Sequence, residues 1–348
     1  MLVAASRPAR RASAVALAVG VLFIAGVALC VGAAPVGPAD LLRAVGAGLG
    51  WVELDPMVKA VLVDVRLPRV ALGLGVGAAL AVSGALMQAI FRNPLAEPAL
   101  VGVSSGAALG AAAAIVFGAA VHLPEALQPV ALPLLAATGG GITTLVVLRL
   151  SRRGGRTATA TLLLAGLAIT SLVNAVLGLA LHWADDAELR NLTFWLLGSL
   201  GGARASHVTV ALPFLVVPVI LALRLAPPLD ALLLGEEEAR HLGIDVERLK
   251  RKAIALAAVA VGAAVALAGV IGFVGLLIPH LIRLGLGPGH GALLPRAALG
   301  GAGLIVLADI VARTAFPPTE LPIGVLTALL GAPFFLWLLL RQEGRFAP

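Results

Sequence analysis

Apolar residues along this chain gather into ten long runs that are separated by short polar segments. Backbone groups inside a bilayer must be hydrogen-bonded within the protein, and a helix needs about 20 residues to cross the hydrocarbon. Each run therefore predicts one membrane-spanning helix. The predicted spans are 13–33, 69–90, 100–118, 128–150, 158–182, 206–225, 253–270, 272–286, 297–315 and 322–341. They predict an all-α polytopic membrane protein with one transmembrane domain over residues 1–348.

The first run is preceded by basic residues and followed by small ones, which is also the pattern of a signal peptide. A run of about 20 residues is long for the apolar core of a signal peptide and suits a membrane span. We therefore expect an uncleaved first helix. The boundary between the seventh and eighth spans is the least defined, because Gly269, Gly272 and Gly275 allow a break at several points.

Two polar connections are longer than a simple turn requires, namely segments 35–67 and 226–252. In the first, Pro38-Ala39-Asp40 followed by leucines predicts a short capped helix at the membrane surface. In the second, Gly235 to Gly243 predicts a short helix with three glutamates at its start and basic residues at its end, as the helix dipole favours. Such a helix suits a solvated loop and a docking element for a partner equally well.

Glycines recur at four-residue spacing inside two predicted spans. Gly73 and Gly77 form one such step, and Gly102, Gly106 and Gly110 form two more. Small residues at this spacing let helix backbones approach closely in lipid. We expect these glycines to serve helix packing and not ligand binding.

Composition and charge agree with a membrane protein. Of the 348 residues, 60% are hydrophobic and 12% are charged, which is about half the charged share of a soluble domain. The net charge of +7 does not indicate nucleic-acid binding, because aromatic residues that would stack on bases make up only 4%. The basic residues cluster in loops, as the positive-inside rule requires, and place both termini in the cytoplasm. The clusters are Arg7, Arg10 and Arg11; Arg149, Arg152, Arg153 and Arg156; and Arg248, Lys250, Arg251 and Lys252.

The chain lacks the residues that would let it drive transport by itself. None of its three lysines, Lys59, Lys250 and Lys252, is followed by Ser or Thr, so it has no P-loop for ATP. Few ionisable residues lie within the spans, and Asp309 and Arg313 are four residues apart on one helix and are expected to pair. We expect no metal site, no cofactor bound by this chain, and an energy source elsewhere.

One catalytic pattern occurs, because Gly102-Val-Ser104-Ser-Gly106 matches the G-x-S-x-G elbow of serine hydrolases. That elbow requires a preceding strand and a base within reach, whereas this segment opens a Gly/Ala-rich span. The histidines near spans are His182, His207 and His280, and His280 follows a proline near a helix end, where a structural role is expected. We therefore interpret the match as coincidental, and no catalytic residue is assigned.

Several longer motifs give the chain a resemblance to a known family, the permease subunits of ABC importers for iron chelates, heme and vitamin B12. The resemblance runs from about Arg66 to Arg341. The motifs are Arg66-Leu-Pro-Arg69, Ser83-Gly-Ala-Leu-Met-Gln88, Arg92-Asn-Pro-Leu-Ala-Glu-Pro98, Gly102-Val-Ser-Ser-Gly106, Leu164-Ala-Gly166, Gly272-Phe-Val-Gly275 with Pro279-His280 and Arg283, and Glu320-Leu-Pro-Ile-Gly324 with Gly331-Ala-Pro333.

The resemblance implies a type II ABC importer permease in the bacterial inner membrane. It implies a homodimer with ten spans per subunit and a path lined by the fifth span, where Thr170, Ser171 and Asn174 are the candidate lining residues. It implies two copies of a cytoplasmic ATPase, which would carry ATP and Mg²⁺ and dock on the helix that Gly235 and Gly243 bound. The expected ATPase contacts are Glu237, Arg240 and Leu242, and the expected cytoplasmic gates are Asn93, Pro94 and Leu95 in one loop and Thr157 and Thr159 in another.

The resemblance also implies a periplasmic binding protein whose glutamates dock on Arg66, Arg69 and Arg313. Arginine suits that role because its planar fork pairs with carboxylates, although snorkelling at the outer interface is an alternative. Small, weakly polar lining residues suit a large, partly apolar cargo. The segment Ser104 to Gly110 resembles the heme branch, with a ferric siderophore or vitamin B12 as alternatives, and an ion-gradient-driven transporter is the alternative mechanism.

Overall fold

The computed structural model describes residues 7–32, 34–118, 128–153 and 156–342. Ten apolar helices dominate it. Seven are long enough to cross a membrane, and three, α5, α13 and α15, are shorter apolar helices. This arrangement confirms the all-α, ten-span prediction. The ten helices are α1 (Arg7–Cys30), α4 (Leu67–Phe91), α5 (Val103–Val116), α6 (Gln128–Leu150), α7 (Thr159–Trp183), α9 (Ala205–Leu223), α12 (Val246–Ala268), α13 (Val274–Leu286), α14 (His290–Thr314) and α15 (Ile323–Gln342).

Shorter elements connect these helices. The described β-structure consists of two two-residue strands, in which Arg152 of β1 lies opposite Thr157 of β2 in antiparallel register. The connecting elements are α2 (Pro38–Gly48), α3 (Pro56–Lys59), the π-helix η1 (Ala60–Arg66), the 3-10 helix η2 (Pro98–Val101), β1 (Arg152–Arg153), β2 (Arg156–Thr157), α8 (Asp186–Leu196), α10 (Ala226–Leu232) and α11 (Glu236–His241).

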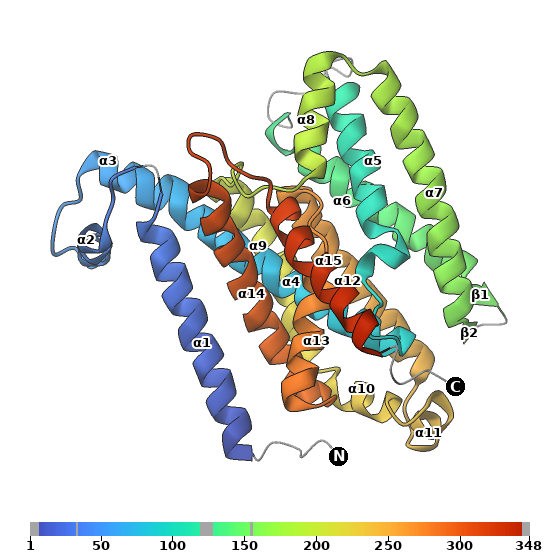
Figure 1. The fold of residues 1–348 in the computed structure, drawn as a ribbon. Helices are drawn as coiled ribbons and strands as arrows, with labels where there is room; N and C mark the ends of the chain where they lie inside the picture. Colours follow the sequence, from blue (N-terminus) through green and yellow to red (C-terminus); the bar gives the residue numbers. More distant parts are fainter. Residues whose placement is uncertain (1–6, 33, 119–127, 154–155, 343–348) are drawn as a thin grey trace.

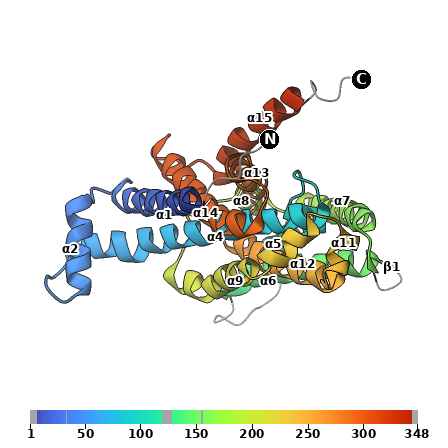
Figure 2. The same cartoon turned by 90° about the horizontal axis from the view of Figure 1, so that it is seen from below.

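The connecting helices gather at the two ends of the bundle (Figure 1). Helices α2, α3 and α8 lie at one end, whereas α10 and α11 lie at the other, together with the start of α1 and the end of α15. Seen along the bundle, α1 and α2 stand apart at one side and α15 projects from another (Figure 2). The two described chain ends therefore share one face, as an even number of crossings requires.

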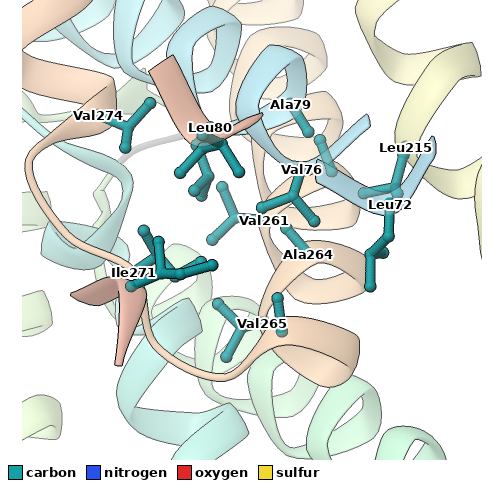
Figure 3. Close-up of a cluster of buried hydrophobic side chains, with 14 of the residues drawn as sticks. Leu72, Val76, Ala79, Leu80, Leu215, Val261, Ala264, Val265, Ile271 and Val274 are labelled. Atoms are coloured by element: carbon teal, nitrogen blue, oxygen red, sulfur yellow. The ribbon is translucent and has the colours of Figure 1, made fainter. Parts of the chain in front are cut away.

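Helix α4 forms the centre of the bundle, and 20 of its 25 residues are buried. Figure 3 shows Leu72, Val76 and Leu80 of α4 packed against Val261 and Val265 of α12, with Leu215 of α9 alongside. A helix that is apolar on all sides suits this position, because other helices cover every face of it.

Glycines bring α4 into backbone contact with its neighbours. A Cβ at Gly77 would overlap the carbonyl oxygen of Gly301 on α14, and a Cβ at Gly84 would overlap that of Gly275 on α13. The same holds for Gly106, whose Cβ would overlap the backbone of α6. The predicted packing role of the small-residue steps is confirmed, because these contacts leave no room for side chains.

Two helix starts differ from the predicted ones. The helix that contains α4 begins at Pro56, well before the predicted start at residue 69, because Asp55 accepts hydrogen bonds from Met57 N and Val58 N and caps it. Helix α12 begins at Val246 instead of 253, where the Asp245 carboxylate accepts from Arg248 N. The break between α12 and α13 falls at residues 269–273.

Helix α8 was not predicted. Its start is a capping box, in which the Asp185 carboxylate accepts from Glu188 N while Glu188 accepts from Asp185 N. A helix of eleven residues is too short to cross a membrane, so the hydropathy pattern does not mark it as a span. The predicted helix at Pro38 is confirmed as α2, where Asp40 accepts from Gly37 N.

The glycine contacts predict that folding stability falls when a larger residue replaces one of these glycines. Gly77→Val places a branched side chain against the Gly301 backbone, and we expect it to cost at least about 3 kcal/mol of folding stability. The measurement is the thermal unfolding midpoint of the purified permease in detergent. Gly178→Val on α7, where nothing lies within 4 Å, is the matched control. An equal midpoint for the two variants would contradict the packing role.

Candidate functional site

The end of the bundle that carries α2 and α8 contains a buried cluster of charges. Arg69, at the start of α4, is its centre, with 8% of its surface exposed. Its Nε donates to Asp309 Oδ1 on α14 at 2.9 Å. Its two terminal nitrogens donate to the two carboxylate oxygens of Glu320 at 3.0 and 2.8 Å, the fork geometry that arginine favours. Arg69 thus joins α4, α14 and the loop before α15.

Arg66 lies one turn before Arg69 and binds backbone instead of carboxylates. Its Nη1 donates to the carbonyl oxygens of Leu29 at 2.7 Å and Cys30 at 3.0 Å, at the end of α1. Its Nη2 donates to Ala34 O at 2.8 Å. The carbonyls of Leu29 and Cys30 are among those that the end of a helix leaves without partners, so Arg66 caps α1 and fixes it to the start of α4.

Arg313, the penultimate residue of α14, completes the cluster. Its Nη2 donates to Ala28 O at 2.5 Å. Its Nε lies 3.5 Å from Asp309 Oδ2, which confirms the pairing predicted from their four-residue spacing. The nearer partner of Asp309 is nevertheless Arg69. A Cβ at Gly32 would lie 3.0 Å from Arg66 Nη2 and 3.5 Å from Arg313 Nη1, so the two guanidinium groups share one pocket.

The structure thus brings Arg66, Arg69 and Arg313 together, but it does not present them at the surface. Each guanidinium is buried and bonded within the chain. Their predicted role in docking a binding protein stays a prediction. Sequence reasoning missed Glu320 as a charge partner, because it was noted only as part of the motif Glu320-Leu-Pro-Ile-Gly324.

Glu320 is the member of the cluster that faces outward, and its side chain is 44% exposed. The hydrogen bonds from Arg69 lower the pKa of the Glu320 carboxyl, against the smaller opposing effect of burial. A carboxylate therefore already occupies the outward fork of Arg69 at neutral pH.

At the opposite end, the predicted helix between Gly235 and Gly243 is present as α11 (Figure 1). Gly235 and Gly243 both have positive φ, at 136° and 81°, which glycine adopts without strain. Ala239 is buried beneath the helix, whereas Glu237, Arg240 and Leu242 are exposed. The three predicted contact residues therefore share the outer surface of α11.

A buried ion pair fixes α11 to the membrane domain. Lys250 of α12, which is 2% exposed, places its Nζ 2.6 Å from Glu236 Oε1. Arg240 also pairs with Glu236, at 3.4 Å. The first residue of α11 is therefore tied to a membrane helix.

Exposed leucines surround α11; Leu242 was predicted as a contact, whereas Leu233 and Leu234 were not. Leu233 and Leu234 precede it and Leu242 ends it, with exposures of 44%, 65% and 62%. An apolar patch rimmed by charged residues outside the apolar spans is typical of a protein-binding surface. The signal in the sequence was the apolar triplet 232–234 directly before Gly235.

The two predicted gate segments lie in different elements. Asn93 lies in an exposed turn after α4, and its Oδ1 accepts from Leu95 N at 2.9 Å; Pro94 lies between them and is also exposed. Thr157 lies in β2 and Thr159 begins α7. Their gating role stays a prediction.

Helix α7 buries only a narrow stripe along its length, formed by Leu162, Gly166, Val173, Leu177 and Ala180. Gly166 sits against the carbonyl of Leu100 in η2 so closely that a Cβ would overlap it. The loop that follows the Asn93 turn therefore touches the helix predicted to line the path.

The predicted path residues lie on both edges of that stripe. Ser171 and Asn174 are exposed, whereas Thr170 is half-buried and its hydroxyl lies 3.3 Å from that of Ser105 on α5. An asparagine exposed on a membrane helix is costly against lipid, so this face favours water or a second protein surface.

The structure also bears on the rejected alternatives. The element before Ser104 is the 3-10 helix η2 and not a strand, so the G-x-S-x-G match does not form a nucleophile elbow. His280 is buried and packs edge-on against Phe334, with ring centroids 5.9 Å apart, a structural contact. In the described part of the chain, no group of three metal-ligating side chains occurs.

Residues 18–341 match the FecCD transport family. The chain belongs to that family. Among FecCD-type relatives, it is 44% identical to the hemin transport system permease protein HmuU of Yersinia pestis, over 94% of this chain and 96% of that one. It is 45% identical to the cobalamin import system permease protein BtuC of Halobacterium salinarum, over 86% of this chain and 82% of that one.

A FecCD-like arrangement is also seen in a solved structure, that of a metal-chelate-type ABC transporter in an inward-facing conformation. The two chains share 33% identity and superpose with a TM-score of 0.82, over 95% of this chain and 99% of that one. The match confirms the type II ABC permease fold that the sequence motifs imply.

The charge cluster predicts that replacing a buried arginine lowers the folding stability more than replacing an exposed one. Arg69→Met leaves Asp309, which is 1% exposed, without its nearest partner, and we expect a loss of about 3–5 kcal/mol. Arg43→Met removes an arginine whose side chain is 68% exposed and which pairs with Asp40, and we expect at most about 1 kcal/mol. Thermal unfolding in detergent checks both variants. Equal shifts in midpoint would contradict the assigned role of Arg69.

Proposed function

We propose that this chain is the membrane permease of an ATP-driven importer that moves heme across the bacterial inner membrane. Membership of the FecCD transport family carries the importer part of the proposal, since the relatives are permease proteins of hemin and cobalamin systems. The chain itself supplies the pathway and the docking surfaces. ATP hydrolysis belongs to a separate chain, and this subunit is not an enzyme.

The heme proposal rests on the extent of one match. The Yersinia hemin permease aligns with 94% of this chain, compared with 86% for the Halobacterium cobalamin permease, at nearly equal identity. The weakly polar side chains of Ser171 and Asn174 suit a large, partly apolar cargo that is passed on without tight binding. A ferric siderophore and vitamin B12 are the alternative cargoes within the same machine.

The partners we propose follow from the two ends of the bundle. Two copies of a cytoplasmic ATPase dock on α11 through Glu237, Arg240 and Leu242, with Gly235 and Gly243 setting its ends. The basic clusters at this end support a cytoplasmic placement, together with both chain termini. Segment 35–67 and α8 then face the periplasm, where a substrate-binding protein docks.

For the binding protein, we propose that carboxylates reach the Arg66, Arg69 and Arg313 cluster by competing with Glu320. Glu320 holds the outward fork of Arg69 and is the exposed member of the cluster. A glutamate on the binding protein offers the same group in the same geometry. Docking would thereby exchange a carboxylate for another one instead of filling an empty site.

We further propose a homodimer around the open faces of α7 and α15. Most of α7 is exposed, and α15 exposes large apolar side chains at Leu329, Leu336 and Leu340. A second copy against these faces would enclose Ser171 and Asn174 between the subunits, away from lipid. The path would then lie along the dimer axis, with the Asn93 and Thr159 segments at its cytoplasmic end.

The cargo is tested by reconstituting the permease in liposomes with its ATPase and binding protein. We expect ATPase activity to rise severalfold when the binding protein carries heme, and not when it carries a ferric siderophore or cobalamin. Stimulation by cobalamin alone would overturn the heme assignment and retain the importer. Uptake by the permease alone, driven by an ion gradient and without ATP, would overturn the importer itself.

The docking role of α11 predicts a local effect. Leu242→Asp places a charge at the centre of the apolar patch, and we expect affinity for the ATPase to fall about thirtyfold, the loss of one interface hot spot of about 2 kcal/mol. Binding between the purified proteins in nanodiscs measures it. Leu49→Asp, an equally exposed leucine at the opposite end, should leave ATPase affinity unchanged. A loss of equal size in both variants would contradict the assignment.

A further inference from the structure

The outer side of α9 and α12 carries a groove that the transport function does not use. Its upper part is a cavity of about 650 Å³ between α6, α9 and α12, lined almost wholly by apolar residues such as Pro133, Phe214 and Ala263. Its lower part is a cavity of about 460 Å³ between α9 and α12. Val259 lines both cavities, so they adjoin at this residue, and we refer to the two together as the groove. Each volume lies within the range of about 300–1,000 Å³ typical of small-molecule sites.

The lower end of this groove is basic. Arg224, directly after α9, and Lys252, in the second turn of α12, both line the lower cavity and are both exposed. Within the described part of the chain, neither side chain forms an ion pair. Neighbouring basic residues do, since Arg248 lies 3.4 Å from Asp245 and Lys250 lies 2.6 Å from Glu236. Two positive charges are therefore left facing one apolar groove.

The dimensions of the groove match a lipid chain. From Lys252 to Leu267, fifteen residues along α12 rise about 22 Å, whereas one leaflet of hydrocarbon is about 15 Å thick. An acyl chain that starts at the Lys252 level would fill the lower cavity, pass Val259 and end near Gly262. The cationic end lies on the side of the bundle where α10 follows α9 (Figure 1).

We propose that this groove binds one anionic phospholipid, with its phosphate between Arg224 and Lys252 and an acyl chain along α9 and α12. The paired charges at the polar boundary explain the preference for an anionic headgroup, since basic pockets between membrane helices hold such headgroups. The apolar cavities explain why the ligand carries an acyl chain. A second copy of this chain is the weaker occupant, because it would have to supply matching acidic groups at the level of Arg224. That the lipid belongs to the cytoplasmic leaflet rests on the proposed orientation of the permease. The preference for an anionic headgroup does not depend on which cargo the permease carries.

The test is native mass spectrometry of the purified full-length permease, titrated with phosphatidylglycerol and with phosphatidylcholine. We expect phosphatidylglycerol to bind more tightly. Arg224→Gln with Lys252→Gln should weaken its binding about fivefold per residue and about twenty-fivefold together, and weaken phosphatidylcholine much less, because its choline cation offsets the phosphate charge. Arg149→Gln with Arg152→Gln, exposed basic residues that line neither cavity, should retain the preference. Equal affinity of the unmodified protein for both lipids would overturn the proposal, as would equal losses in the two double variants.

A second pair of variants separates the acyl chain from the headgroup. Val259→Trp fills the point where the cavities join and should weaken both lipids, whereas Val216→Trp, an exposed valine on another face of α9 that lines neither cavity, should weaken neither. The soluble headgroup glycerophosphoglycerol should not bind. Tight binding of that headgroup would overturn the acyl-chain role, and a change in the dimer fraction without a change in lipid binding would assign the groove to a subunit contact. These measurements use neither ATPase nor cargo, so their failure would leave the importer proposal intact.

Discussion

Close contact between helix backbones is the constraint on which the rest of this structure depends. Helix α4 reaches α14 through Gly77 and Gly301, and it reaches α13 through Gly84 and Gly275. In lipid, apolar side chains gain little by leaving one hydrocarbon environment for another, so association relies on close packing and hydrogen bonds. With α4 held in this way, its start lies at the charge cluster and its end leads into the Asn93 turn.

At one end, Arg66 at the end of η1 and Arg69 at the start of α4 link helices through hydrogen bonds and ion pairs. Arg66 satisfies carbonyls at the end of α1, whereas Arg69 joins α14 and the loop before α15 through Asp309 and Glu320. Charges buried so deeply are stable only with partners. The same cluster lies where we propose that a binding protein docks, so a docking carboxylate would act on groups that hold four segments together.

At the other end, the turn after α4 leads to the Asn93 segment, and α11 is tied to α12 by the Lys250–Glu236 pair. The surfaces left open fall into three kinds. The leucines around α11 lie outside the apolar spans, the exposed face of α7 carries Ser171 and Asn174, and the groove of α9 and α12 carries Arg224 and Lys252. Their different chemistry suits three different partners: an ATPase, a second permease copy and a phospholipid.

The sequence by itself determined the number of spans, the helix at Gly235–Gly243, the packing role of the glycines and the family. Each depends on local composition or on motifs. Because a bilayer contains no water to bind backbone groups, long apolar runs form helices, which satisfy these groups internally. Helix α8 and the early start of α4 were missed, because side-chain caps at Asp185 and Asp55 set them and hydropathy does not register caps. Only the tertiary structure decided that Arg69 binds Glu320, 251 positions away, and that Arg224 and Lys252 line one groove. Such pairings depend on which helices pack side by side, and spacing along a chain does not encode that.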